Sequence, residues 1–145
     1  MFVRKRGRLT FRQSAAIPYR KGEDGCEILL MTSRTNHRWI IPKGLIEPHL
    51  SPPASAAEEA YEEAGVRGKI CDTCLGTYPV EKWDAHGTVE VYALKVTEEL
   101  DDWPEKDDRE RQWLPIKQAI ETAGDEGVVE VLRTFQKRKK KKNGG

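Results

Sequence analysis

An acidic stretch in the middle of the chain, residues 54–65, constrains its folding more than any other feature. It reads Ala-Ser-Ala-Ala-Glu-Glu-Ala-Tyr-Glu-Glu-Ala-Gly. At about 100° per residue, a helix would place small residues on one face and glutamates on the other. The small face is formed by Ala57, Ala60, Tyr61 and Ala64, and the acidic face by Glu58, Glu59, Glu62 and Glu63. Ser51 before Pro52 is a typical helix start and Gly65 a typical stop, so the pattern predicts a helix ending near Ala64.

The acidic face has no compensating charge in the neighbouring sequence. Solvated helices usually interleave acids with Lys or Arg three or four residues away, yet neither type occurs between Gly44 and Arg67. The like-charge pairs Glu58/Glu62 and Glu59/Glu63 each cost about 0.2–0.5 kcal/mol in an isolated helix. A divalent cation, which prefers carboxylate oxygens, would offset that repulsion. The residues by themselves leave two interpretations open, a metal site and a solvated acidic face.

The remaining sequence indicates one α/β domain. The chain has 145 residues, about the size of a single domain, with 34% charged and 37% hydrophobic residues. Apolar stretches separated by turn-forming residues predict strands, and two segments near the C-terminus have helical patterns. The predicted strands are 14–19, 26–31, 39–41, 66–80, 89–96 and 113–114, with a loop over 43–50; the predicted helices beyond the acidic one are 116–122 and 128–137.

Basic residues gather at the two ends, although the net formal charge is only +1. Residues 4–12 include five basic and no acidic side chains, and residues 137–142 are all Lys or Arg. We therefore divide the chain into a basic N-terminal segment (1–11), one domain (12–138) and a disordered basic tail (139–145). The tail is short and lacks aromatic residues, so we interpret it as solvated rather than as a nucleic-acid site.

The cysteine content and the hydropathy of the chain predict its cellular compartment. Three cysteines without a secretory signal indicate a reducing compartment, and no apolar run approaches the roughly 20 residues that cross a bilayer. We expect a cytoplasmic protein with no membrane partner. Cys71 and Cys74 fall in a predicted strand, where residues three apart point to opposite faces, so we expect ordinary burial rather than a zinc or redox pair.

The segment from Gly44 to Val66 resembles the Nudix box, G-x5-E-x7-R-E-U-x-E-E-x-G-U, where U is aliphatic. The matches keep fixed spacing throughout: Gly44, Glu59, Ala60, Glu62, Glu63, Gly65 and Val66. Two positions depart, because Leu50 stands where the pattern has Glu and Glu58 stands where it has Arg. The resemblance implies the Nudix fold, a mixed β-sheet sandwiched between α-helices.

The resemblance also implies a hydrolase of the EC 3.6.1 type that cleaves a phosphoanhydride bond with Mg²⁺, or with Mn²⁺ in its place. Such a metal neutralises phosphoryl charge, orients water and lowers its pKa. By position, Glu59, Glu63 and the backbone carbonyl of Lys43, beside Gly44, would bind the metal. Glu62 would be the base that activates water.

Similarity to one group, the diphosphoinositol polyphosphate phosphohydrolases, extends from about residue 12 to about residue 135. It is carried by residues 32–42, 61–69, 96–104 and 109–114. Members of this group also cleave diadenosine polyphosphates. The resemblance implies a substrate pocket in which Arg12, Ser33, Arg34 and Arg109 contact phosphates, with Arg111 as a lesser candidate. Gln13 and Ser14 stand where the group has further basic residues.

We therefore expect hydrolysis of a phosphorylated small molecule such as a diphosphoinositol polyphosphate or a diadenosine polyphosphate. Two alternatives stay open. A non-catalytic Nudix-like module that senses a ligand is suggested by Leu50 and Glu58. An RNA-end-processing enzyme is suggested by the two basic ends.

Overall fold

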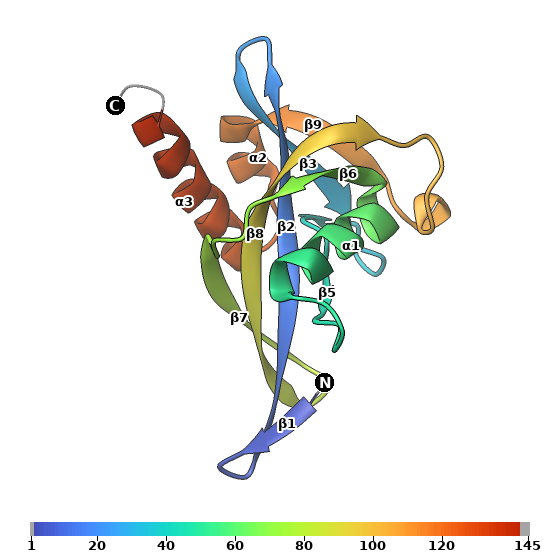
Figure 1. Ribbon diagram of the computed structural model, residues 1–145, viewed down its shortest axis with the longest axis vertical. Helices are drawn as coiled ribbons and strands as arrows, with labels where there is room; N and C mark the ends of the chain where they lie inside the picture. The colour runs from blue at the N-terminus through green and yellow to red at the C-terminus, as the bar shows by residue number, and fades with distance from the viewer. Residues whose placement is uncertain (1, 143–145) are drawn as a thin grey trace.

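The computed structural model describes residues 2–142, which form one mixed sheet with helices on both of its faces (Figure 1). The strands are β1 Phe2–Lys5, β2 Arg8–Gly22, β3 Gly25–Thr32, β4 Trp39–Ile40, β5 Lys43–Leu45, β6 Val66–Ile70, β7 Gly76–Lys82, β8 Ala85–Glu99 and β9 Arg111–Pro115. The helices are α1 Pro52–Ala64, α2 Ile116–Thr122 and α3 Glu126–Lys142, with a 3-10 turn over Lys106–Asp108. None of the helices within residues 2–142 is long and apolar enough to cross a membrane.

Two long parallel strands, β2 and β8, form the centre of the sheet. Their register runs from Thr10 opposite His86 to Tyr19 opposite Lys95. The sheet order is β4-β3-β2-β8-β6, with β1 and β5 also pairing with β2, β7 with β8 and β9 with β3. Strands buried on both faces read as nearly continuous apolar runs, which explains residues 14–18 of β2. The predicted sandwich is confirmed.

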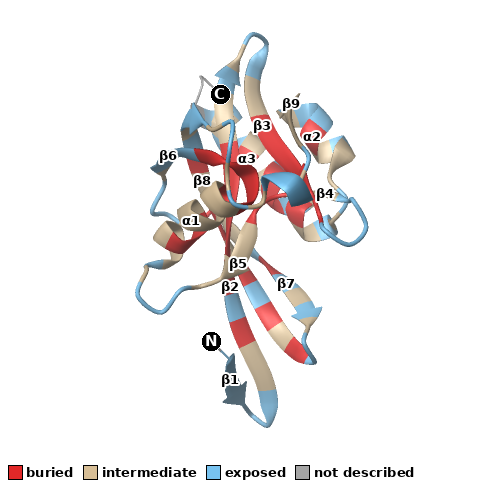
Figure 2. Ribbon diagram, turned by 90° about the vertical axis from the view of Figure 1, so that its right-hand side faces the viewer, coloured by how far each residue is buried: buried red, intermediate tan, exposed pale blue. Residues whose placement is uncertain are grey.

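Each face of the sheet has its own core. On one face, α1 packs through alanines against Leu29, Met31 and Leu94. On the other face, α2 and α3 cover Ala15, Ile17 and Leu30. Figure 2 shows these buried segments gathered in the half of the molecule that the helices cover.

Beyond the helices, the sheet continues as a narrow ribbon, which we call the arm. It consists of residues 2–12 from β1 and β2 and residues 80–88 from β7 and β8. The arm projects at the end of the molecule opposite the β2–β3 hairpin (Figures 1 and 2). The segment predicted as a basic N-terminal piece, 1–11, is thus largely part of the sheet.

Helix α1 has the predicted bounds because its caps are local. Ser51 Oγ accepts a hydrogen bond from the backbone N–H of Ala54 at 3.2 Å. Gly65 adopts a left-handed conformation with φ 68°, and its N–H donates to the carbonyl of Tyr61. The predicted small face was partly wrong, since the buried alanines are Ala56, Ala60 and Ala64 rather than Ala57. This rotation turns Glu63 into the protein.

The predicted strand over 66–80 is in fact two strands, and the cysteines lie in the link between them. Residues 71–75 connect β6 to β7, so the argument from opposite strand faces does not apply to Cys71 and Cys74. The expected burial is wrong for Cys71, which is exposed, whereas Cys74 is half-buried and its thiol donates to the Gly76 carbonyl at 3.3 Å. Both thiols are free.

Helix α3 is longer than predicted and includes the start of the basic tail. It continues to Lys142 because its last turns still contact the protein, with the Lys139 ammonium 4.1 Å from the ring centroid of Tyr19. Residues 139–142 are therefore helical rather than disordered. The rest of the predicted tail, residues 143–145, lies outside the described residues.

Candidate active site

The carboxylate of Glu63 is the centre of the site, where α1 meets β5. The Glu63 side chain is 12% exposed. Its Oε1 accepts a hydrogen bond from the backbone N–H of Lys43 at 3.0 Å, and its Oε2 lies 3.4 Å from Arg109 Nη2. The Trp103 indole donates to the Glu63 carbonyl at 3.1 Å and holds the end of the helix. The Glu63 carboxylate therefore lies next to the backbone of Lys43, whose carbonyl is the metal ligand that the resemblance to the Nudix box implies.

Glu59, one turn earlier, lies directly against Gly44. A Cβ built on Gly44 would come within 2.6 Å of the carboxylate carbon and both oxygens of Glu59. Ordinary contact distances begin at 3.4 Å, so only glycine permits this approach. Gly44 pairs with Ser14 of β2, whose hydroxyl is buried without a hydrogen-bond partner. The spacing Gly44-x14-Glu59 therefore has a steric cause.

The two carboxylates have strongly raised pKa values. Burial raises the pKa of Glu59 to about 8, and repulsion from Glu63 and Glu62 adds to the effect. Burial also raises the pKa of Glu63 to about 7, although Arg109 and the Lys43 N–H oppose the shift. The pKa of the more solvated Glu62 is raised as well, first by desolvation and then by Glu58. Crowded, desolvated carboxylates of this kind gain most from a bound cation.

These acids fit a Mg²⁺ ion as its protein ligands. Within residues 2–142 no group of three or more His, Cys, Asp or Glu side chains is arranged to hold a metal by itself. Mg²⁺ usually keeps several waters and takes only one or two carboxylates from the protein. Glu59 and Glu63, with the Lys43 carbonyl, would supply that set.

Arg109 joins a second network beside Glu63. It is 7% exposed, and it donates to Glu105 Oε1 at 2.8 and 3.0 Å and to the Thr32 carbonyl at 2.9 Å. Arg34, which is more than half exposed, also binds Glu105 Oε1 at 2.7 Å. The predicted phosphate ligands Arg34 and Arg109 are thus brought together beside the carboxylates. Glu105, which binds both Arg34 and Arg109, was not predicted from the sequence.

Ser33 has a local structural partner. Its hydroxyl accepts a hydrogen bond from the Arg38 N–H at 3.0 Å and lies 3.3 Å from the Asn36 side chain. This closes the turn between β3 and β4 that carries Arg34. A phosphate contact from Ser33 stays a prediction.

Arg12 and Arg111 lie in other surroundings. Arg12 is exposed and forms two hydrogen bonds with Glu90 at 2.6 and 3.0 Å, next to the loop that contains Leu50. Arg111 donates to the carbonyls of Ala64 and Leu100 at 2.8 and 2.6 Å and stacks on Trp103. The structure therefore gives Arg111 a role in closing the end of α1.

Charged residues from elsewhere in the chain lie near the central acids at the two departures from the box. Glu58 replaces the cation of the pattern, and Arg109 instead places its guanidinium 3.4 Å from Glu63. The acid that it places at position 50 is matched by Glu47, which is close enough to raise the pKa of Glu59 and Glu62. The site thus retains charges of both kinds around its central acids.

Two lysine side chains near the carboxylates were not predicted as site residues. Burial lowers the pKa of Lys43, with repulsion from Lys82 as the next cause, and burial likewise lowers the pKa of Lys82. The carboxylate of Glu63 favours the charged form of each. One face of β7 carries every second residue, here Tyr78, Val80 and Lys82. Correct strand bounds would therefore have placed Lys82 on the same face as Tyr78.

Comparisons with known proteins show similarity to one family. A family model described as the NUDIX domain matches residues 10–135. The chain is 39% identical over 119 residues to "Nudix hydrolase 12, mitochondrial" of Arabidopsis thaliana, an alignment that covers 75% of this chain and 58% of that protein. It is 37% identical over 111 residues to diphosphoinositol polyphosphate phosphohydrolase 3-alpha of Homo sapiens, with 75% and 66% covered. The chain thus spans less than two thirds of the length of these relatives.

A solved structure shows the same architecture. The crystal structure of the C. elegans Ap4A hydrolase superimposes with a TM-score of 0.71 at 25% sequence identity, covering 88% of this chain and 96% of that one. The fold expected from the box is therefore confirmed.

Proposed function

The chain belongs to the NUDIX domain family, and on that premise we propose that it hydrolyses a phosphoanhydride bond of a highly phosphorylated small molecule with Mg²⁺, or with Mn²⁺ in its place. The observation that carries the proposal is the pair Glu59 and Glu63. Both are desolvated and crowded, and both have pKa values raised to near neutrality. Crowding two desolvated acids in this way is unfavourable without a counter-charge, and a bound cation would offset the cost.

Glu59, Glu63 and the Lys43 carbonyl would hold the metal, which when bound neutralises phosphoryl charge and lowers the pKa of water. Arg109 and the Lys43 N–H fix the Glu63 carboxylate from two sides. Glu62 is partly exposed, and desolvation raises its pKa above the ordinary value, a direction that suits a general base. Glu62 would take the proton from the attacking water.

The cations around these acids support a substrate rich in phosphate. Arg34 approaches from the β3–β4 turn, and Lys43 and Lys82 approach from the sheet. Arg binds phosphate through paired donors and Lys as a point charge. We propose a diphosphoinositol polyphosphate or a diadenosine polyphosphate as the substrate, in line with the names of the relatives. The matching charges of Arg109 and Glu47 favour an active enzyme over a ligand-sensing module.

The test is hydrolysis with Mg²⁺ across diphosphoinositol polyphosphates, diadenosine polyphosphates, nucleotide sugars and capped RNA. Glu62→Gln is the active-site variant, and Glu121→Gln, an exposed acid on α2, is the matched control. We expect turnover of one of the first two classes, reduced about 10²–10⁴-fold in Glu62→Gln and unchanged in the control. Tight binding of a panel member without turnover would instead establish the sensing module.

A further inference from the structure

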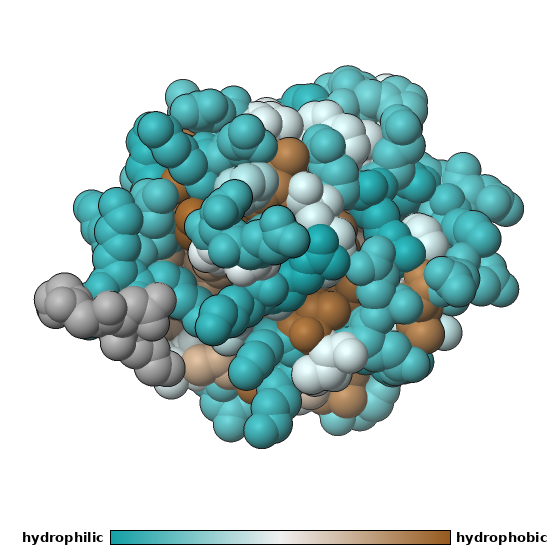
Figure 3. Space-filling view, turned by 90° about the horizontal axis from the view of Figure 1, so that it is seen from above, coloured by the Kyte–Doolittle hydropathy of each residue, from teal (hydrophilic) through white to brown (hydrophobic). Residues whose placement is uncertain are grey.

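The tip of the arm gathers the exposed aromatic surface of the protein. Among residues 2–142, the exposed large hydrophobic side chains are Phe2, Val3 and Trp83, at 38%, 56% and 53% exposure. Phe2, Phe11 and Trp83 form a triangle with ring centroids 5.1–5.5 Å apart. The opposite end of the molecule, seen in Figure 3, is mainly hydrophilic. Such a cluster at the end of a projecting ribbon suggests a binding surface.

The turn that carries Trp83 is conformationally costly. Trp83 and Asp84 have φ values of 54° and 52°, and they form the two-residue loop between the paired residues Lys82 and Ala85. Hairpin loops of this type strongly prefer Asn or Gly, and a bulky aromatic with positive φ is a genuine outlier. Strained positions of this kind concentrate at functional sites. The backbone here holds an indole out into solvent.

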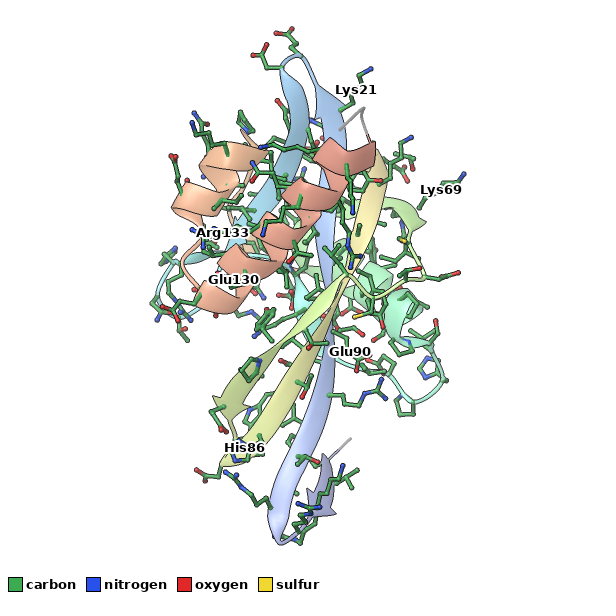
Figure 4. The ribbon with its side chains drawn as sticks, turned by 90° about the vertical axis from the view of Figure 1, so that its left-hand side faces the viewer. Lys21, Lys69, His86, Glu90, Glu130 and Arg133 are labelled. Carbon is green, nitrogen blue, oxygen red and sulfur yellow. The ribbon has the colours of Figure 1, made fainter. Side chains whose placement is uncertain are left out.

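Basic side chains surround the aromatic cluster. A cleft of about 850 Å³ beside Trp83 is lined by Arg4, Arg8, Lys82 and His86 as well as by Glu81 and Asp84. The His86 side chain contacts Glu81 near the start of β8, below Glu90 (Figure 4). Lys5 and Arg6 add to the positive charge of the arm. The bases of a single strand can stack on exposed aromatic rings while its phosphates bind the neighbouring basic side chains.

We propose that the arm is a docking surface for single-stranded nucleic acid, whose bases stack on Trp83 and Phe2 and whose phosphates meet Arg4 and Arg8. The arm leads to the catalytic site along β7, whose Lys82 lines the cleft beside Trp83 and whose Tyr78 ring centroid lies 5.9 Å from the Lys43 ammonium. Binding of a strand to the arm does not depend on the proposed function.

The experiment measures fluorescence anisotropy of a 3′-labelled single-stranded RNA of about twelve nucleotides, and of DNA of the same sequence, in EDTA so that no hydrolysis occurs. Trp83→Asn removes the ring and suits the left-handed turn, so the variant should fold. We expect it to weaken binding about 5- to 150-fold. Arg4→Ala/Arg8→Ala should lower the slope of log affinity against log salt by about 1.4. Lys140→Ala/Lys141→Ala on α3 is the control and should change neither.

Three results would overturn the proposal. The first is an RNA and DNA affinity that Trp83→Asn leaves unchanged. The second is a wild-type dimer that Trp83→Asn converts to a monomer in light scattering, which would make the tip an interface between copies. The third is binding to vesicles of phosphatidylcholine and phosphatidylglycerol, but not to oligonucleotides, that is lost in Trp83→Asn. Hydrolysis of the small-molecule panel by Trp83→Asn keeps this test separate from that of the proposed function.

Discussion

The substitution Gly44→Ala tests whether activity depends on the close approach of the Glu59 carboxylate to residue 44. The added methyl would lie within 2.6 Å of all three atoms of the Glu59 carboxylate, whereas ordinary contact begins at 3.4 Å. The carboxylate must therefore retreat by about 1 Å, and a misplacement of that size costs roughly 10²-fold in rate. Overpacking costs about 1–3 kcal/mol, and we expect the lower end because the flexible Glu59 side chain can move. The variant should stay folded and lose activity.

Gly76→Ala is the matched control, because its Cβ would meet only Val131 Cγ1 at 3.6 Å. The assays are kcat/KM on the preferred substrate, Mg²⁺ affinity by titration calorimetry, and thermal unfolding. We expect Gly44→Ala to lose about 10²-fold in kcat/KM with weaker Mg²⁺ binding, and Gly76→Ala to change the free energy of unfolding by less than about 1 kcal/mol. Full activity and Mg²⁺ affinity in Gly44→Ala would refute the steric argument.

Three further predictions concern pH and stability. Without metal, folded Glu59 keeps its proton up to a pKa of about 8, whereas an ordinary glutamate releases it near 4.5, so stability should fall as pH rises from 5 to 8. Glu59→Gln should flatten that decline by about 1–2 kcal/mol, allowing for solvent screening of the half-exposed group, and an unchanged pH slope in EDTA would contradict the assignment. Arg111→Ala should lower the free energy of unfolding by about 2–4 kcal/mol because main-chain carbonyls lose their donor, with Arg133→Ala, exposed on α3, as the nearly neutral control in urea. Ser51→Ala should cost about 1 kcal/mol through loss of the N-cap, and a change below about 0.3 kcal/mol would show that tertiary contacts alone hold α1.

The local features of this protein were available from its sequence. Helix α1 begins after Ser51 and ends at Ala64, before the cap residue Gly65, as predicted, because caps act within one turn. The register of Glu59, Glu62 and Glu63 follows from the helix period and from the fixed spacing to Gly44. The central strands were predicted because strands buried on both faces consist of apolar residues.

The tertiary structure decided which distant groups reach those acids. Arg109 and Glu105 follow β8 in the chain, yet the pairing of β9 with β3 brings them beside Glu63. Lys82 reaches the same site through the pairing of β7 with β8. Sheet packing also turned Ala56 rather than Ala57 into the core and left Cys71 exposed. Periodicity and caps report interactions over a few residues, whereas burial, pKa and charge pairing depend on neighbours that only the strand order brings together.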